Sequence, residues 1–292
     1  MIDPRITRLA DVLVSHSTRL TPGEHVLIET FDAPDAVAIE LVKAAHRVGA
    51  HPHVAVRRNR IARALLEAGA DAQFETWSAY DKGRMERMDA YIAIRGSDNV
   101  SELAGIDAER MQSYGKLYQK PVHLEQRVKN TKWCVLRWPS PSMAQLAQMN
   151  TAAFEDFYFN VCTLDYQRMA DAVQPLKSRM ERTDEVRIAG PGETDITFSI
   201  KDIPVVPCTG SHNIPDGECF TSPVRDSVNG VMHYNTPTIY RGITFENIKL
   251  TFRNGQIVDA TADQNGELLK DIFDTDDGAR YVGEFAIGFN PF

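Results

Sequence analysis

Residues 24–56 read EHVLIETFDAPDAVAIELVKAAHRVGAHPHVAV and decide the fold of the N-terminal part of the chain. The apolar run in residues 24–29 predicts a strand. Asp32 suits a helix N-cap, and the apolar spacing after it predicts a helix that ends at Gly49. Residues 51–56 then alternate between polar and apolar side chains and predict a second strand. The order strand, helix, strand is typical of a unit with two parallel strands.

The alternation of strands and helices continues further along the chain. Residues 60–88 and 104–116 are expected to be helical, and residues 89–96 and 131–138 are expected to form the third and fourth strands. Short turns join these elements, so we predict an α/β scaffold domain over residues 1–180. Its mostly parallel sheet requires helices on both faces to bury it.

The pattern changes near residues 176–184. Residues 185–188 and 194–200 alternate with the period of two that is typical of strands. Residues 253–256, Arg-Asn-Gly-Gln, are a strong signal for a tight hairpin turn. We therefore predict a second, α+β and mainly antiparallel domain over residues 181–292.

Length and charge limit the class of protein. The chain has 292 residues, more than one ordinary hydrophobic core accommodates, which also predicts two domains. Its composition, 43% hydrophobic and 25% charged, is that of a soluble globular protein. The net charge of −8 argues against nucleic acid as a partner, because binding to phosphates requires clustered positive charge.

The cysteines and the N-terminus predict a cytoplasmic protein. The four cysteines form no Cys-x-x-Cys pair, so we expect reduced thiols and no zinc ribbon. The first residues lack the basic and then apolar layout of a signal peptide. No apolar run reaches the ~18 residues that are needed to cross a bilayer, so no membrane association is expected.

A turn-rich stretch, residues 211–223 (SHNIPDGECFTSP), carries the first candidate site. Its Pro-Asp-Gly core is turn chemistry and places Glu218 at the start of an extended segment. A carboxylate at the exit of a rigid turn suits metal binding or proton transfer. The alternative is a solvated glutamate after an ordinary turn. Cys219 is a weaker candidate nucleophile, because no cysteine-enzyme signature surrounds it.

A second glutamate repeats the local pattern of the first. Glu218 and Glu284 each follow a glycine and precede an apolar segment. Two carboxylates from separate strands can hold a pair of divalent ions. Zinc and related ions also bind imidazole, and His212 and His233 flank the Glu218 turn. A lone histidine near a turn more often forms a structural hydrogen bond at the surface or in the core.

Several long motifs resemble the thermophilic metalloaminopeptidase family, which includes aminopeptidases T and S and PepS. The resemblance is carried by residues 213–223, 226–230 and 276–290 and covers nearly all of the chain. It implies a dinuclear metal exopeptidase that removes N-terminal residues from peptides. It also implies zinc or cobalt as the metal, with magnesium or manganese as alternatives, and a homodimer.

The resemblance also implies roles for individual residues. Glu218 and Glu284 match the two glutamate ligands of the family, and Glu218 is also the candidate acceptor of a proton from the attacking water. His212 and Asn213 are expected to contact the substrate. The remaining ligands of the family, two histidines and a His-x-Asp aspartate, are expected beyond the Gly-Phe-Asn-Pro stretch, and the chain ends at Phe292.

That departure leads us to expect a truncated second domain and leaves the activity of this form open. Two alternatives remain beside the peptidase. One is a mononuclear iron ring-cleaving dioxygenase of the same fold, acting on dihydroxypyridines. The other is a folded dimeric binding protein without catalytic activity.

Overall fold

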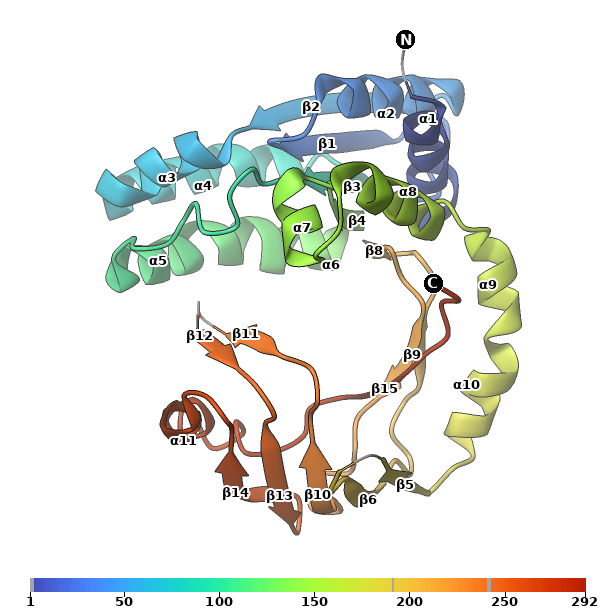
Figure 1. The fold of residues 1–292 in the computed structure, drawn as a ribbon. Helices are drawn as coiled ribbons and strands as arrows, with labels where there is room; N and C mark the ends of the chain where they lie inside the picture. Colours follow the sequence, from blue (N-terminus) through green and yellow to red (C-terminus); the bar gives the residue numbers. More distant parts are fainter. Residues whose placement is uncertain (1–2, 191, 241–242) are drawn as a thin grey trace. The chain divides into compact units, whose positions relative to one another are not determined.

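The computed structural model describes residues 3–190, 192–240 and 243–292 (Figure 1). The chain divides into two compact units. The first unit contains Met1–Met169, Thr209–Asp216 and Phe292, and the second contains Ala170–Cys208 and Gly217–Pro291. Residues 209–216, assigned from the sequence to the second domain, therefore lie in the first unit.

The first unit is built on a parallel sheet with the strand order β2-β1-β3-β4-β8. Its strands are β1 (His25–Phe31), β2 (His51–Arg57), β3 (Ala90–Arg95), β4 (Lys132–Arg137) and β8 (Asn213–Ile214). Its helices are α1 (Pro4–Asp11), the π-helical η1 (Val12–Ser17), α2 (Asp35–Arg47), α3 (Asn59–Ala68), α4 (Asp71–Met85), α5 (Ala108–Tyr114), the π-helical η2 (Gly115–Arg127), α6 (Val128–Asn130), α7 (Pro141–Leu146) and α8 (Thr151–Cys162).

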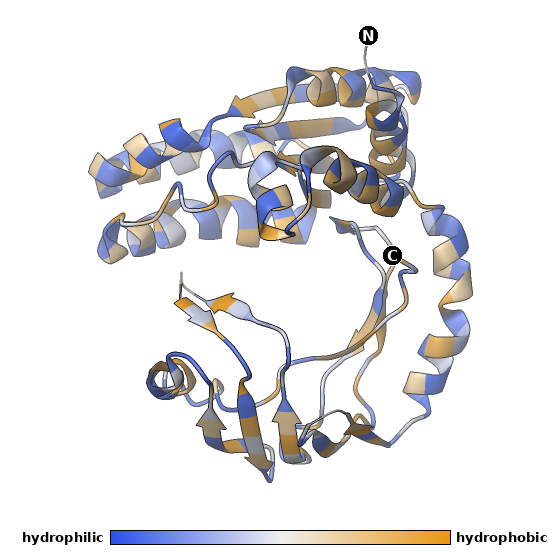
Figure 2. Ribbon diagram, in the orientation of Figure 1, coloured by the Kyte–Doolittle hydropathy of each residue, from blue (hydrophilic) through white to orange (hydrophobic). Residues whose placement is uncertain are grey.

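Helices cover both faces of this sheet, as a parallel sheet requires. On one face, Leu27 and Tyr91 pack with Met85 of α4 and Val122 of η2. On the other face, α2 packs against β1 and α1 packs against α2. In Figure 2 the helices of the first unit alternate between hydrophilic and hydrophobic residues, as expected for helices with one face against a sheet.

The two-residue strand β8 explains why residues 209–216 belong to the first unit. The backbone N–H of Val135 in β4 donates a hydrogen bond to the carbonyl of His212 at 2.9 Å. The ring of His16 forms a hydrogen bond of 2.7 Å with the carbonyl of Thr209. The first contact joins the segment to the edge strand β4, and the second joins it to η1.

The second unit is antiparallel. Its main sheet has the order β14-β13-β10-β6-β5, and a three-stranded sheet has the order β15-β9-β7. Its strands are β5 (Glu185–Ala189), β6 (Asp195–Ser199), β7 (Val206–Cys208), β9 (Glu218–Thr221), β10 (Asn229–His233), β11 (Thr238–Tyr240), β12 (Ile243–Phe245), β13 (Lys249–Arg253), β14 (Gln256–Thr261) and β15 (Phe285–Gly288). Helices α10 (Gln174–Glu181), η3 (Gly266–Leu268) and α11 (Leu269–Phe273) complete it, and α9 (Tyr166–Ala172) begins in the first unit.

The expected hairpin lies between β13 and β14. Asn254 and Gly255 both have positive φ, 49° and 83°, which the two central residues of a type I′ turn require. Ile196, Phe252 and Ile257 are among the residues of the buried core of this unit. The parallel sheet of the first unit and the antiparallel sheets of the second confirm the predicted fold class. Within the described residues, no helix combines the length and the apolar character needed to cross a membrane.

Candidate functional site

The turn before Glu218 is fixed by hydrogen bonds and by a glycine. The carboxylate of Asp216 accepts a hydrogen bond of 2.7 Å from the N–H of Gly210. Gly217 has a φ of +136°, and a Cβ placed on it would lie 2.6 Å from the Cβ of Asn290. Its carbonyl accepts hydrogen bonds from the N–H groups of Phe289 at 2.8 Å and Asn290 at 3.2 Å. Only glycine fits at this position, so the residue before Glu218 is determined by the backbone.

The strands that carry the two candidate glutamates are neighbours. Strand β15 pairs with β9 in antiparallel register, with Gly288 opposite Glu218 and Phe285 opposite Thr221. Glu284 immediately precedes β15. The hydroxyl of Ser222 donates a hydrogen bond of 2.6 Å to the carbonyl of Gly283, which fixes the chain directly before Glu284. Two segments far apart in sequence therefore meet in the second unit.

The same register separates the two carboxylates along the strands. Glu218 lies opposite Gly288, which is four residues after Glu284. At a rise of about 3.3 Å per residue, the two glutamates are about 13 Å apart along the strand direction. Glu218 is the first residue of β9, whereas Glu284 lies just outside β15 and has no partner in this register. The two glutamates therefore lie at opposite ends of the β9–β15 pair.

The described residues provide suitable donors for a divalent ion but no closed metal site. Carboxylate oxygens are ligands for zinc and for the harder divalent ions. However, no group of three or more His, Cys, Asp or Glu side chains in the described part of the chain converges in a way that could hold a metal ion.

The two expected substrate contacts, His212 and Asn213, lie in the first unit. The ring of His212 packs edge-on against Trp133, with ring centroids 4.6 Å apart. The side-chain amide of Asn213 donates a hydrogen bond of 3.2 Å to the carbonyl of Val135. Both residues are exposed, and both contacts attach them to β4.

The contacts of His233 and Cys219 are of the kind that stabilise a fold. In β10, the backbone N–H of His233 donates a hydrogen bond of 3.0 Å to the hydroxyl of Thr194. Cys219 is fully buried in the core of the second unit. Burial raises the pKa of its thiol, which disfavours the reactive thiolate.

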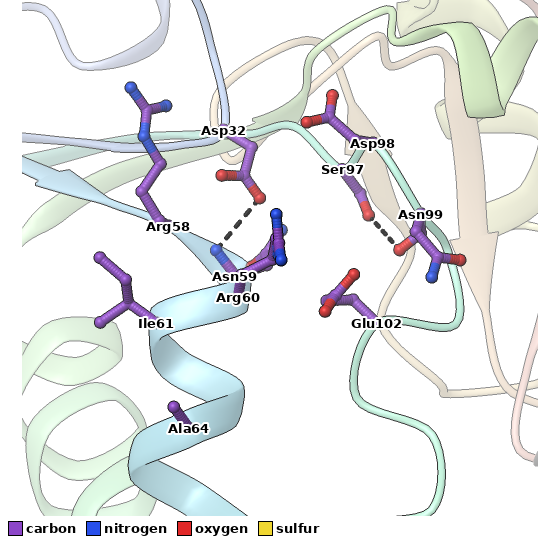
Figure 3. Close-up of a pocket in the computed structure, with 10 residues that line it drawn as sticks. All are labelled: Asp32, Arg58, Asn59, Arg60, Ile61, Ala64, Ser97, Asp98, Asn99 and Glu102. Atoms are coloured by element: carbon purple, nitrogen blue, oxygen red, sulfur yellow. Dashed lines mark hydrogen bonds between the residues drawn. The ribbon is translucent and has the colours of Figure 1, made fainter.

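Two pockets lie at the carboxyl ends of the parallel strands in the first unit. One has a volume of about 620 Å³ and a polar lining (Figure 3). In it, the carboxylate of Asp32 accepts a hydrogen bond of 3.1 Å from the N–H of Asn59, and Asp98, Glu102 and Arg60 also line it. The other has a volume of about 770 Å³, and most of its lining residues come from β3 and the loop after it, from β4 and β8, and from the helices α7 and α8.

The sequence does not predict the second pocket. The signal for it is weak: an arginine ends each of the two predicted strands, at Arg95 and Arg137. Arginines at strand ends are common on protein surfaces. Only the pairing of β3 with β4 shows that these two lie opposite each other.

The chain is similar to known aminopeptidases and to proteins of the same fold. It is 27% identical over 318 residues to aminopeptidase AmpS of Bacillus subtilis strain 168, an alignment that covers 97% of this chain and 76% of that protein. Its structure resembles that of wild-type AmpT from Thermus thermophilus with a TM-score of 0.77 and 20% identity, over 99% of this chain and 79% of that one. It also resembles 2,5-dihydroxypyridine dioxygenase from Pseudomonas putida KT2440, with a TM-score of 0.55 and 13% identity over 97% of this chain and 76% of that one.

The likenesses to the two solved structures show a shared fold. Family membership rests on the sequence match, which runs over almost the whole chain. Residues 2–291 match the family described as thermophilic metalloprotease (M29). The chain therefore belongs to this metallopeptidase family, as its resemblance to the metalloaminopeptidases predicted.

Proposed function

We propose that this protein is a divalent-metal-dependent aminopeptidase that removes N-terminal residues from peptides. The observation that carries the proposal is the pairing of β9 with β15, because Glu218 begins β9 and Glu284 immediately precedes β15. The full-length match to the metalloprotease family supports the reaction class. The aminopeptidase names of its relatives support cleavage at the N-terminus.

Within this proposal, Glu218 and Glu284 are metal ligands. A bound divalent ion would supply polarisation of a carbonyl and a lowered pKa for bound water. The fixed turn at Gly217 would hold the Glu218 carboxylate in place as ligand and as acceptor of a proton. His212 and Asn213 are proposed to contact the substrate from the edge of the parallel sheet.

The finer features rest on the family resemblance. We propose zinc or cobalt, or else magnesium or manganese, as a pair of ions, a homodimer, and a cytoplasmic location. The net charge of −8 supports peptides rather than nucleic acids as partners.

Metal analysis combined with a peptidase assay tests the proposal. The chain is reconstituted with zinc or cobalt, its metal content is measured by mass spectrometry, and hydrolysis of aminoacyl anilides is followed. We expect Glu218→Gln and Glu284→Gln each to lower metal content and to reduce activity at least about 100-fold. Glu185→Gln is the matched control, because Glu185 is an exposed strand glutamate of the same unit. Unchanged metal content and activity in both site variants would refute the assignment.

A non-catalytic binding protein is the second candidate. One observation favours it, namely that no three-ligand group forms within the described residues. Absence of bound metal after reconstitution, together with absence of hydrolysis, would support this candidate. Turnover of dihydroxypyridine with iron, without peptidase activity, would instead support a dioxygenase.

A further inference from the structure

The larger strand-end pocket of the first unit has the position expected of a ligand site. It lies where β3, β4 and β8 end, and its volume is about 770 Å³. In open parallel sheets, ligands bind in the crevice outside the carboxyl ends of the strands. The volume is within the range of pockets that hold small molecules. All of its lining residues belong to the first unit.

Two arginines lie side by side at this pocket. Arg95 is the last residue of β3, Arg137 is the last residue of β4, and the two are direct partners in the parallel register. Neighbouring strands are about 4.8 Å apart, and register partners project to the same face of a sheet. Both arginines are exposed and both line the pocket.

No aspartate or glutamate is among the described residues that line this pocket. Among the described residues, neither guanidinium forms an ion pair: the 17 ion pairs between described side chains include neither residue. Like charges directly opposite each other on adjacent strands are unfavourable. An anion bound between them would relieve this repulsion, and a planar carboxylate matches the forked donors of arginine.

The rest of the lining indicates which anion. Val100, Met143, Phe154 and Phe157 supply apolar surface, and Phe157 is 44% exposed. The hydroxyls of the pocket are already engaged, because Ser142 donates to the carbonyl of Ser97 at 2.6 Å and pairs with Ser140 at 2.8 Å. Arginines bind phosphate and carboxylate alike, but an inorganic phosphate would leave the apolar wall uncovered, whereas a carboxylate with an apolar side chain uses both the arginines and that wall.

We propose that this pocket binds the C-terminal carboxylate of a short peptide whose last side chain is apolar. The choice of a peptide rests on the proposed aminopeptidase function. The pocket would make a free C-terminus a recognition element, so short peptides would be preferred over long ones and over C-terminal amides.

A blocked ligand separates this proposal from the proposed catalysis. N-acetyl-Gly-Leu has no free N-terminus, so an aminopeptidase does not cleave it, and its binding does not depend on a competent metal site. Titration calorimetry of the full chain compares this peptide with its C-terminal amide and with inorganic phosphate. We expect the free acid to bind at least about 10-fold more tightly than the amide.

The variants then test the two arginines. Arg95→Gln and Arg137→Gln should each weaken binding of the acid about 10-fold and remove the difference between acid and amide. Arg253→Gln is the matched control, because Arg253 is also an exposed arginine at the end of a strand, β13, in the second unit.

Two results would overturn the proposal. One is equal binding of acid and amide by the unmodified protein, which needs no variant to interpret. The other is binding of inorganic phosphate as tightly as the peptide acid, which would indicate a simple anion site. Failure of the aminopeptidase assay alone would leave these binding measurements unaffected.

Discussion

Replacing Arg57 with methionine is expected to destabilise the first unit by about 3 kcal/mol, because Arg57 pairs with the buried carboxylate of Glu29 and the partly buried carboxylate of Asp81. Its Nε lies 2.8 Å from Oε1 of Glu29, and its Nη2 lies 2.7 Å from Oδ2 of Asp81. Glu29 is only 3% exposed. The hydroxyls of Tyr91 and Tyr118 donate to the same two carboxylates at 2.7 Å and 2.6 Å.

The magnitude follows from what the substitution leaves behind. Removing one partner of a buried ion pair costs about 3–5 kcal/mol, because the other charge stays desolvated without compensation. Arg57 retains 24% side-chain exposure and Asp81 keeps a second contact with Arg84 at 3.1 Å, so the lower end of the range applies. Methionine retains most of the apolar stem, which limits the loss of packing.

The assay can be confined to the first unit. The chain has three tryptophans, and Trp77, Trp133 and Trp138 all lie in this unit. Their fluorescence during urea unfolding therefore reports the stability of the first unit separately, which matters because a chain with two units need not unfold in one step.

Two further variants test whether the uncompensated charge causes the loss of stability. Arg60→Met changes an exposed arginine without an ion pair in the described structure and should cost less than about 0.5 kcal/mol. Adding Glu29→Gln to Arg57→Met removes the uncompensated charge and should restore at least about 1 kcal/mol. A loss below about 1 kcal/mol for Arg57→Met, or no recovery in the double variant, would refute the reasoning.

Two further predictions concern the Glu218 turn and the acid stability of the first unit. Gly217→Ala should lower the free energy of unfolding by about 2 kcal/mol or more, because alanine disfavours a φ of +136° and its Cβ would lie 2.6 Å from that of Asn290. Hydrogen exchange of the β9 and β15 amides measures this loss of stability. Unchanged protection of these amides would contradict the prediction. Burial lowers the pKa of His123 to about 4, so its imidazole stays neutral in the native state. In the unfolded chain the same imidazole takes up a proton below about pH 6.5. The free energy of unfolding therefore decreases as the pH falls below about 6.5. His123→Gln should remove about 2 kcal/mol of that loss between pH 7 and pH 4.5 in fluorescence-detected unfolding, and an unchanged pH dependence would contradict the assignment.

Local patterns predicted most of the fold. The strand expected at residues 24–29 is β1, His25–Phe31, and the strand expected at 51–56 is β2. Both are long enough to show their apolar pattern in the sequence. Strand β8 has two residues and no periodicity, so its attachment to β4 is visible only in the folded chain. The placement of His212 and Asn213 in the first unit could not be predicted for that reason.

The arrangement of the candidate metal site likewise depends on strand pairing that the sequence does not predict. Each Gly-Glu motif is local and was identified from the sequence, but the register between β9 and β15 depends on packing across distant segments. That register puts Gly288, and not Glu284, opposite Glu218. A shift of one residue would also move the side chains of one strand to the other face, so the position of Glu218 relative to β15 is a property of the folded sheet.

The proposed metal site and the proposed carboxylate pocket can be tested separately, because their residues lie in different units. Glu218 and Glu284 belong to the second unit, whereas Arg95 and Arg137 belong to the first. If both proposals hold, Glu218→Gln loses metal and activity but still binds N-acetyl-Gly-Leu, because that ligand needs only the strand-end pocket. Arg137→Gln should retain its metal while the selectivity for free acids over amides disappears. Loss of both properties in either variant would mean that the pocket and the glutamates form a single site, and the separate carboxylate pocket would have to be abandoned.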